Sequence, residues 1–158
     1  MTGMLALIAG EGALPAAVAA AQPDRPIVCA LRGHAPEGLE PDHVFRIEML
    51  GGLMAMLRGQ GVTRICLCGA VRRPALDPAA IDAPTRPMVP RLQEALRSGD
   101  DGALRTVIAL FEEAGFAVVA AHEAAPDLVP PSGVLTVAQP GPSAEAEAVL
   151  GQRVVAEM

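Results

Sequence analysis

The chain contains no lysine, tryptophan or tyrosine, and only 2% of its 158 residues are aromatic. All twelve basic residues are arginine, and against eighteen acidic residues they leave a net charge of −6. A protein of this charge with almost no aromatic side chains offers neither the basic patch nor the stacking surface that nucleic acids require. We therefore expect no nucleic-acid partner.

Cysteine and long apolar segments are also scarce. The three cysteines lie in apolar runs without the spaced partners of a zinc site, and we interpret them as small buried residues. No run reaches the roughly 18 to 20 apolar residues of a membrane span. The apolar first twenty residues have no basic start, and Glu11 and Pro15 interrupt them, which is unlike a signal peptide. These features predict a cytoplasmic protein.

The hydrophobic fraction of 51% is sufficient for the aliphatic core of one domain. Short, mainly apolar segments predict strands, most of them buried on both faces, over 4–9, 27–31, 62–68 and 116–121. Apolar residues at helical spacing predict helices over 15–22, 48–58, 87–97 and 101–114. This alternation predicts an α/β fold, a Rossmann-like open parallel sheet with helices on both faces.

The last third of the chain has a different composition. Five prolines and two glycines over 124–142 indicate a linker, which could include an edge strand over 134–137. An amphipathic helix capped by Ser143 is predicted over 143–158. We therefore divide the chain into a substrate-binding domain over 1–123, the linker and the C-terminal helix.

Ligands of open parallel sheets bind where the carboxyl ends of the strands meet. The turn after the first predicted strand contains Gly10, Gly12, Ala13 and Leu14, and its backbone N–H groups could approach a phosphate. The same residues could equally form a tight turn with no ligand. We take them as candidate substrate-binding residues.

Arginines follow the third predicted strand. Arg73 is the strongest candidate for a phosphate contact, because a guanidinium offers forked donors and a permanent charge. Asp82, further along the same segment, is a second candidate. Solvated arginines that pair with Asp77 or Asp82 are an equally good interpretation.

Acidic residues and a histidine complete the candidate set. Asp100 and Asp101 could bind a metal or sugar hydroxyls, although their position also suits the start of a helix. His122 and Glu123 follow the last predicted strand and could bind a phosphate or a hydroxyl, but such a pair is also common on surfaces. The other two histidines lie in a polar loop without spaced partners and are assigned no role.

Several common enzyme classes lack their motifs here. The sequence contains no G-x-S-x-G, no P-loop lysine and no H-E-x-x-H. The residues alone therefore indicate a domain for a phosphate-bearing ligand. Two alternatives stay open: a nucleotide-binding or NADP-binding module, suggested by Gly10 and Gly12 with Arg32 after the next strand, and a non-catalytic oligomerisation module, suggested by the C-terminal helix.

Four motifs in order resemble one known family. They are Ile8-Ala9-Gly10-x-Gly12-x-Leu14-Pro15, Gly69-x-Val71-x-Arg73-Pro74, Gly99-Asp100-Asp101-x-x-Leu104-Arg105, and Gly115-Phe116 followed by Ala121-His122-Glu123. Their order and spacing resemble the UDP-2,3-diacylglucosamine pyrophosphatases of the LpxI type, from Met4 to about Thr136. Position 11 is Glu where the family commonly has glycine, which brings a negative charge near any bound phosphate.

The resemblance implies a metal-dependent hydrolase, with Mg²⁺ as the expected ion, that splits UDP-2,3-diacylglucosamine into lipid X and UMP in lipid A biosynthesis. It also implies homo-oligomers and peripheral contact with the inner membrane. The family's second domain, which carries its metal-binding and catalytic motifs, does not appear in this sequence, so the catalytic residues are unassigned. We expect the chain alone to bind substrate but to hydrolyse it slowly or not at all.

Overall fold

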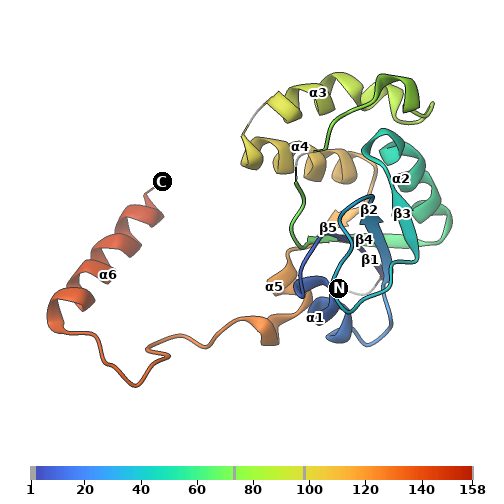
Figure 1. Cartoon of the computed structure of the whole chain (residues 1–158). Coiled ribbons are helices and arrows are strands. Elements are labelled where there is room, and N and C mark those ends of the chain that lie inside the picture. Colours follow the sequence, from blue (N-terminus) through green and yellow to red (C-terminus); the bar gives the residue numbers. More distant parts are fainter. Residues whose placement is uncertain (1–2, 73, 98, 158) are drawn as a thin grey trace. The chain divides into compact units, whose positions relative to one another are not determined.

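The computed structural model describes residues 3–72, 74–97 and 99–157 (Figure 1). The chain divides into two compact units, Met1–Leu128 and Val129–Met158. Within these described ranges, the first unit contains the sheet and five α-helices, and the second contains one helix, α6 (Pro142–Ala156). The candidate site lies entirely in the first unit.

Five parallel strands form one sheet. They are β1 (Met4–Ala9), β2 (Ile27–Leu31), β3 (His43–Phe45), β4 (Val62–Cys68) and β5 (Ala117–Val118). Their order in the sheet is β3-β2-β1-β4-β5, so the chain starts in the middle and adds strands on either side. The middle strand, β1, and its neighbours β2 and β4 are largely buried, which suits their mainly apolar sequences. The predicted α/β open parallel sheet is confirmed.

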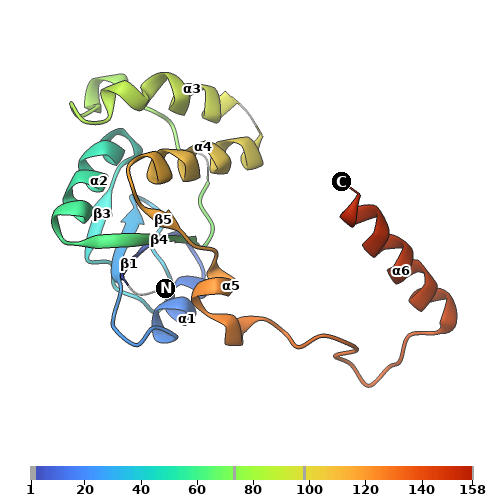
Figure 2. The same ribbon diagram turned by 180° about the vertical axis from the view of Figure 1, so that it is seen from behind.

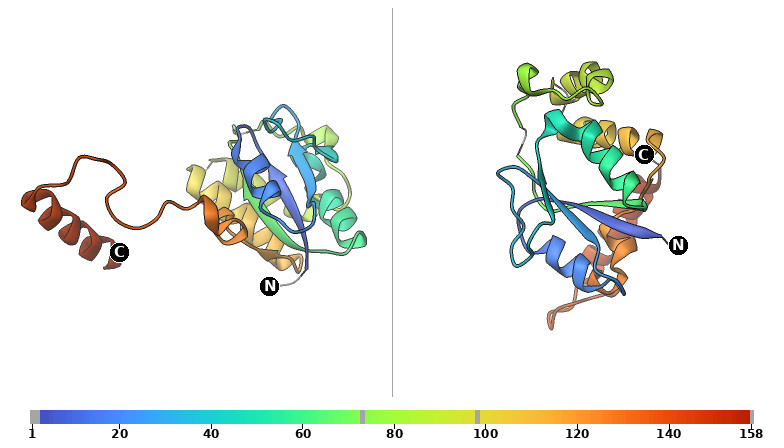
Figure 3. Two further views of the ribbon diagram at one scale, coloured as in Figure 1. Left: turned by 90° about the horizontal axis from the view of Figure 1, so that it is seen from below. Right: turned by 90° about the vertical axis from the view of Figure 1, so that its right-hand side faces the viewer.

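Helices cover both faces of the sheet. They are α1 (Leu14–Ala20), α2 (Leu50–Gly59), α3 (Val89–Arg97), α4 (Asp100–Glu113) and α5 (Ala121–Ala124). The edge-on view in the right panel of Figure 3 places α2 and α4 on one face and α1 on the other. Figures 1 and 2 both show α3 lying over α4, in a further layer outside the sheet, and the two helices pack together.

The core consists of two apolar clusters, one on each face of the sheet. On the first face, residues of α2, α3 and α4 pack against alternate strand residues such as Ala6 and Ile65. Phe111 lies in this cluster and meets Phe116 edge to face, with ring centroids 5.9 Å apart. On the second face, Leu7 packs with Val18 of α1. The separation of the clusters follows from the alternation of side chains along each strand.

The structure differs from the sequence prediction at the sheet edges. The short strand β3 was not predicted, and it forms because the preceding Asp42 is fixed beside β2. The Asp42 N–H donates to the Val28 carbonyl and the Asp42 carboxylate accepts the Val28 N–H, both at 2.8 Å. Arg25 adds an ion pair to the same carboxylate at 2.7 Å. Together these bonds bring the next three residues into register with β2.

Two predicted segments near the end of the chain also differ. The strand predicted over 116–121 is shortened to the two residues of β5, and α5 begins at Ala121. In the described part of 129–141 no strand is present over 134–137, where prolines flank the apolar run. α6 is capped by Gly141 rather than Ser143. None of the helices in the described ranges is long and apolar enough to cross a membrane.

Candidate functional site

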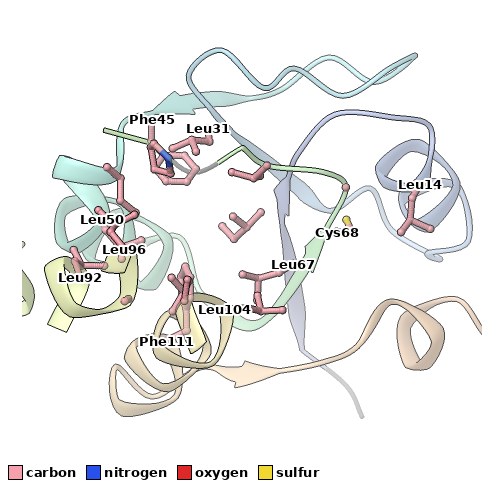
Figure 4. A pocket seen from close by; sticks show the side chains of 18 residues that line it. Leu14, Leu31, Phe45, Leu50, Leu67, Cys68, Leu92, Leu96, Leu104 and Phe111 are labelled. Carbon is pink, nitrogen blue, oxygen red and sulfur yellow. The ribbon is translucent and has the colours of Figure 1, made fainter. Parts of the chain in front are cut away.

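An apolar pocket of about 480 Å³ lies between the first face of the sheet, α3 and α4. Side chains from four strands and from the four helices α1 to α4 line it, and Figure 4 labels among them Leu31, Phe45, Leu50, Leu67, Leu92, Leu96, Leu104 and Phe111. Most of these strand residues stand at the carboxyl ends of their strands, the edge at which ligands of such sheets bind. The pocket therefore occupies the position predicted for a ligand, but its walls are apolar.

The pocket has a buried floor and a partly exposed mouth. Leu92 and Phe111 are almost fully buried, whereas Leu14, Val71 and Leu104 also line the pocket and are 43%, 48% and 48% exposed. Exposed apolar side chains around an apolar cavity mark a place where a ligand can enter. Figure 4 shows Leu14 on α1, at the far side of the pocket from Leu92.

Arginines are sequence neighbours of the lining residues. Arg32 follows Leu31, Arg72 follows Val71, and both arginines are exposed. The Arg72 side chain is 84% exposed. A guanidinium beside an apolar cavity suits a ligand that combines a hydrocarbon chain with an anionic group.

The glycine turn after β1 forms hydrogen bonds that join the end of β1 to the end of β4. The Gly10 N–H donates to the Cys68 carbonyl at 2.8 Å, and Glu11 and Ala70 exchange two backbone hydrogen bonds at 2.8 and 2.9 Å. The strand ends approach so closely that a Cβ on Gly10 would lie 2.8 Å from the Ala70 carbonyl carbon. The N–H groups of residues 10 and 11 are therefore bonded to the last residue of β4 and to the segment that follows it.

The remaining turn residues lead into α1 and toward the pocket. Gly12 has φ +95°, a conformation that favours glycine, and a Cβ there would meet nothing within 4 Å. Ala13 is the N-cap of α1, and Leu14, its first residue, lines the pocket. Of the four predicted turn residues, Leu14 is the one that contacts the cavity.

Glu11 links three loops at this edge of the sheet. Its carboxylate lies 2.9 Å from the His34 Nδ1 atom and 3.6 Å from the Arg72 guanidinium. The His34 side chain is 11% exposed, although sequence analysis assigned it no role. The negative charge expected at position 11 is therefore paired with neighbouring side chains. Residues 23 positions apart form this pair, and no local pattern in the sequence indicates it.

The arginine segment after β4 is only partly described. Arg73, the predicted phosphate contact, lies outside the described residues. The Asp82 carboxylate accepts the Thr85 N–H at 2.8 Å. The backbone N–H of Asp82 donates to the backbone carbonyl of Glu48 at 3.1 Å. Asp77, considered as an arginine partner, lies 3.7 Å from the Arg46 guanidinium.

Glu48 is a buried acid that sequence analysis did not single out. Its side chain is 3% exposed and accepts hydrogen bonds from Arg46 Nε, Arg46 Nη2 and the Asp77 N–H at 3.1, 3.2 and 2.8 Å. Burial by itself would raise the pKa of this carboxyl group, but these hydrogen bonds outweigh it and hold the pKa below its ordinary value. Glu48 is therefore ionised at neutral pH.

The other predicted acids lie in α4 and α5, and two of them have a described partner. Asp100 is the first residue of α4, and Asp101 pairs with Arg105 one turn later at 2.7 Å. The Glu123 carboxylate accepts the Ala120 N–H at 2.8 Å at the start of α5. His122 is exposed on the same short helix. Neighbouring residues of α5 pack in the cluster with α1, so the structure does not bring His122 and Glu123 to the pocket.

The comparisons with known proteins identify the family of the chain. The family model for the LpxI N-terminal domain matches residues 4–128, which include every residue lining the pocket. A relative from Caulobacter vibrioides, named UDP-2,3-diacylglucosamine pyrophosphatase LpxI, is 36% identical over 143 residues. That alignment covers 87% of this chain and 51% of the relative, so the chain spans about half the relative's length. The resemblance noted in the motifs is confirmed, and the chain belongs to the LpxI N-terminal domain family.

Proposed function

We propose that this chain binds the lipid part of UDP-2,3-diacylglucosamine and serves in hydrolysis of its pyrophosphate to lipid X and UMP, a step of lipid A biosynthesis. The observation that carries the proposal is the apolar pocket at the carboxyl edge of the sheet, inside the part of the chain that matches the family. The named activity of the relative supports the reaction.

The chemistry of the pocket suits an acyl chain. Its volume of about 480 Å³ lies within the range of roughly 300 to 1,000 Å³ of small-molecule sites. Burial of each methylene group contributes about 0.8 kcal/mol, so a chain that fills the pocket would supply most of the binding free energy. The arginines beside the mouth would then bind the phosphate groups of the same ligand.

We also propose that hydrolysis uses a divalent metal, Mg²⁺. The described residues contain no group of three or more His, Cys, Asp or Glu side chains that could hold an ion. Because these residues do not fit a metal site by themselves, we assign no ligand and no step to the metal. The reaction would draw its metal ligands from further parts of a longer protein, as the length of the relative allows.

The assay for the reaction is UMP release from UDP-2,3-diacylglucosamine by the 158-residue chain with Mg²⁺. We expect substrate binding with slow release or none, because hard cations need clustered oxygen ligands. Rapid turnover by this chain alone would contradict the division of labour proposed here and would direct the search for catalytic groups to the acidic residues named above.

Arg73 is our candidate for the phosphate contact. We expect Arg73→Ala to weaken binding of UDP-2,3-diacylglucosamine by about 1.5 to 3 kcal/mol, the range for hydrogen bonds to charged groups, while the fold is retained. Calorimetry measures the affinity. Arg86→Ala, an exposed arginine of the same connection that is outside the pocket lining, is the matched control. Equal affinity of parent and Arg73→Ala would remove Arg73 from the site.

Assembly and location complete the proposal. We propose a cytoplasmic homo-oligomer with peripheral membrane contact, since the acyl chains of the substrate reside in a membrane. Valines and a leucine of α6 are exposed, namely Val149, Leu150, Val154 and Val155, and could pair with a second copy. Sedimentation velocity tests the oligomer, and co-flotation with vesicles tests the membrane contact. A monomer that stays in solution would contradict both.

A further inference from the structure

The connection between β4 and α3, residues 69–88, forms part of the pocket mouth. Its described residues, 69–72 and 74–88, contain no regular structure apart from two short 3₁₀ turns, Pro78–Ala80 and Arg86–Met88. Val71 and Pro74 of this connection line the pocket. A connection of this length is unusual in a compact domain and commonly serves function. Ordering it costs conformational entropy, so it needs specific anchors.

Glu48 anchors this connection at two points. Its carboxylate accepts the Asp77 N–H at 2.8 Å, and its backbone carbonyl accepts the Asp82 N–H at 3.1 Å. One residue therefore binds both sides of the first 3₁₀ turn. A carboxylate that is 3% exposed is costly unless it is paired, and Arg46 provides the pairing charge.

A second anchor lies beside the first. Thr85, fully buried, accepts the Gly51 N–H on its hydroxyl oxygen at 2.8 Å. Gly51 permits this approach because a Cβ there would lie 2.7 Å from the Thr85 nitrogen and closer still to the Pro84 carbonyl group. The far end of the connection is thus fixed directly to the start of α2.

The segment that contains Glu48 and the connection that it anchors both reach the pocket. Phe45 and Ile47, on either side of Arg46, line it, as do Val71 and Pro74 on the connection. We propose that Glu48 is a positioning residue for ligand binding, which holds the connection so that Val71, Arg72 and Pro74 stay at the mouth of the pocket. This inference rests on the proposed function, because it assumes an anionic lipid as the ligand.

The test compares two ligands and two variants in the full chain. Glu48→Ala removes the carboxylate, and Glu48→Gln keeps an oxygen acceptor for the Asp77 N–H but removes the charge.

We expect Glu48→Ala to lower the affinity for UDP-2,3-diacylglucosamine about tenfold or more, since a small displacement of a positioning group has effects of this order. The affinity for dodecyl maltoside, a neutral single-chain amphiphile used below its micelle concentration, should change less than about twofold because it needs only the apolar floor. Glu48→Gln should restore part of the loss.

Hydrogen exchange supplies a readout that does not depend on the ligand. In Glu48→Ala we expect the Asp77 and Asp82 amides to exchange at least about tenfold faster, with the amides of β1 and β4 unchanged. Glu113→Gln, an exposed acid paired with Arg91 away from the pocket, is the matched control and should change neither binding nor exchange.

The outcomes separate the two proposals. A parent chain that binds neither ligand contradicts the proposed function, and the positioning role with it. A parent that binds both ligands while Glu48→Ala keeps full affinity for the anionic lipid contradicts the positioning role alone. Equal losses for both ligands together with faster exchange throughout the sheet would mean that Glu48 only stabilises the fold, which also overturns the proposal.

Discussion

Replacing Gly10 with alanine is expected to destabilise the first unit by at least about 3 kcal/mol, the upper end of the usual cost of overpacking. The added Cβ would lie 2.8 Å from the Ala70 carbonyl carbon and 2.9 Å from that of Gly69, and closest to the Ala70 oxygen. These are backbone atoms, so no side chain can rotate away. Two hydrogen bonds between Glu11 and Ala70 hold the strand ends at this distance.

Denaturant unfolding measures this loss. Gly59→Ala is the matched control, because a Cβ there meets nothing within 4 Å and the residue lies in α2 without positive φ. We expect that control to raise the free energy of unfolding by about 0.5 to 1 kcal/mol, the helix preference of alanine over glycine. A Gly10→Ala chain as stable as the parent would show that the ends of β1 and β4 are not closely packed.

Replacing Val107 with tryptophan is expected to reduce the affinity for UDP-2,3-diacylglucosamine at least about 100-fold. Val107 lies on α4 and lines the pocket, so the larger ring would occupy space that an acyl chain needs. Excluding about four methylene groups at roughly 0.8 kcal/mol each removes about 3 kcal/mol, which corresponds to that factor. The pocket of about 480 Å³ has room for the ring, and the stability of the fold should be retained.

The control is Val44→Trp, which adds the same ring at an exposed position of β3 outside the pocket lining. It should leave affinity and stability close to those of the parent. Fluorescence of the introduced tryptophan offers a second readout, because the parent has none. The emission of Val107→Trp should lie at a shorter wavelength than that of Val44→Trp, because the first ring would lie in the apolar pocket and the second at an exposed position. Unchanged lipid affinity in Val107→Trp would exclude the pocket as the acyl site.

Three strands of the sheet could be predicted from the sequence because each one is marked by its own run of neighbouring residues. The strands at 4–9, 27–31 and 62–68 have the predicted bounds. The first two are continuous apolar runs, and the third is apolar except for Thr63 and Arg64 near its start. β3 was missed because three residues carry too little pattern, and the bonds of Asp42 to Val28 that hold it join residues 14 apart. Edge elements depend on such pairings more than on their own sequence.

The sequence indicated the carboxyl edge of the sheet as the place for a ligand, but it did not indicate that the pocket there would be apolar. The carboxyl edge of the sheet and Leu14 follow from strand order and a turn motif. The apolar pocket could not be predicted, because Leu104, Val107 and Phe111 have the spacing of an ordinary apolar stripe that faces the core. Glu48 resembles a solvated helix residue in sequence, and only the tertiary contact with Asp77 reveals its burial. Long-range pairs of this kind have no local signature.

The most direct test of the acyl site is the affinity of the 158-residue chain for UDP-2,3-diacylglucosamine compared with UDP-glucosamine, which has the same headgroup without acyl chains. Because the pocket walls are apolar, we expect the acylated ligand to bind at least about 100-fold more tightly. NADPH, titrated alongside, tests the alternative of a dinucleotide-binding module and should not bind. Equal affinities for the two UDP-sugars, or binding of NADPH alone, would contradict an acyl-chain site in this pocket.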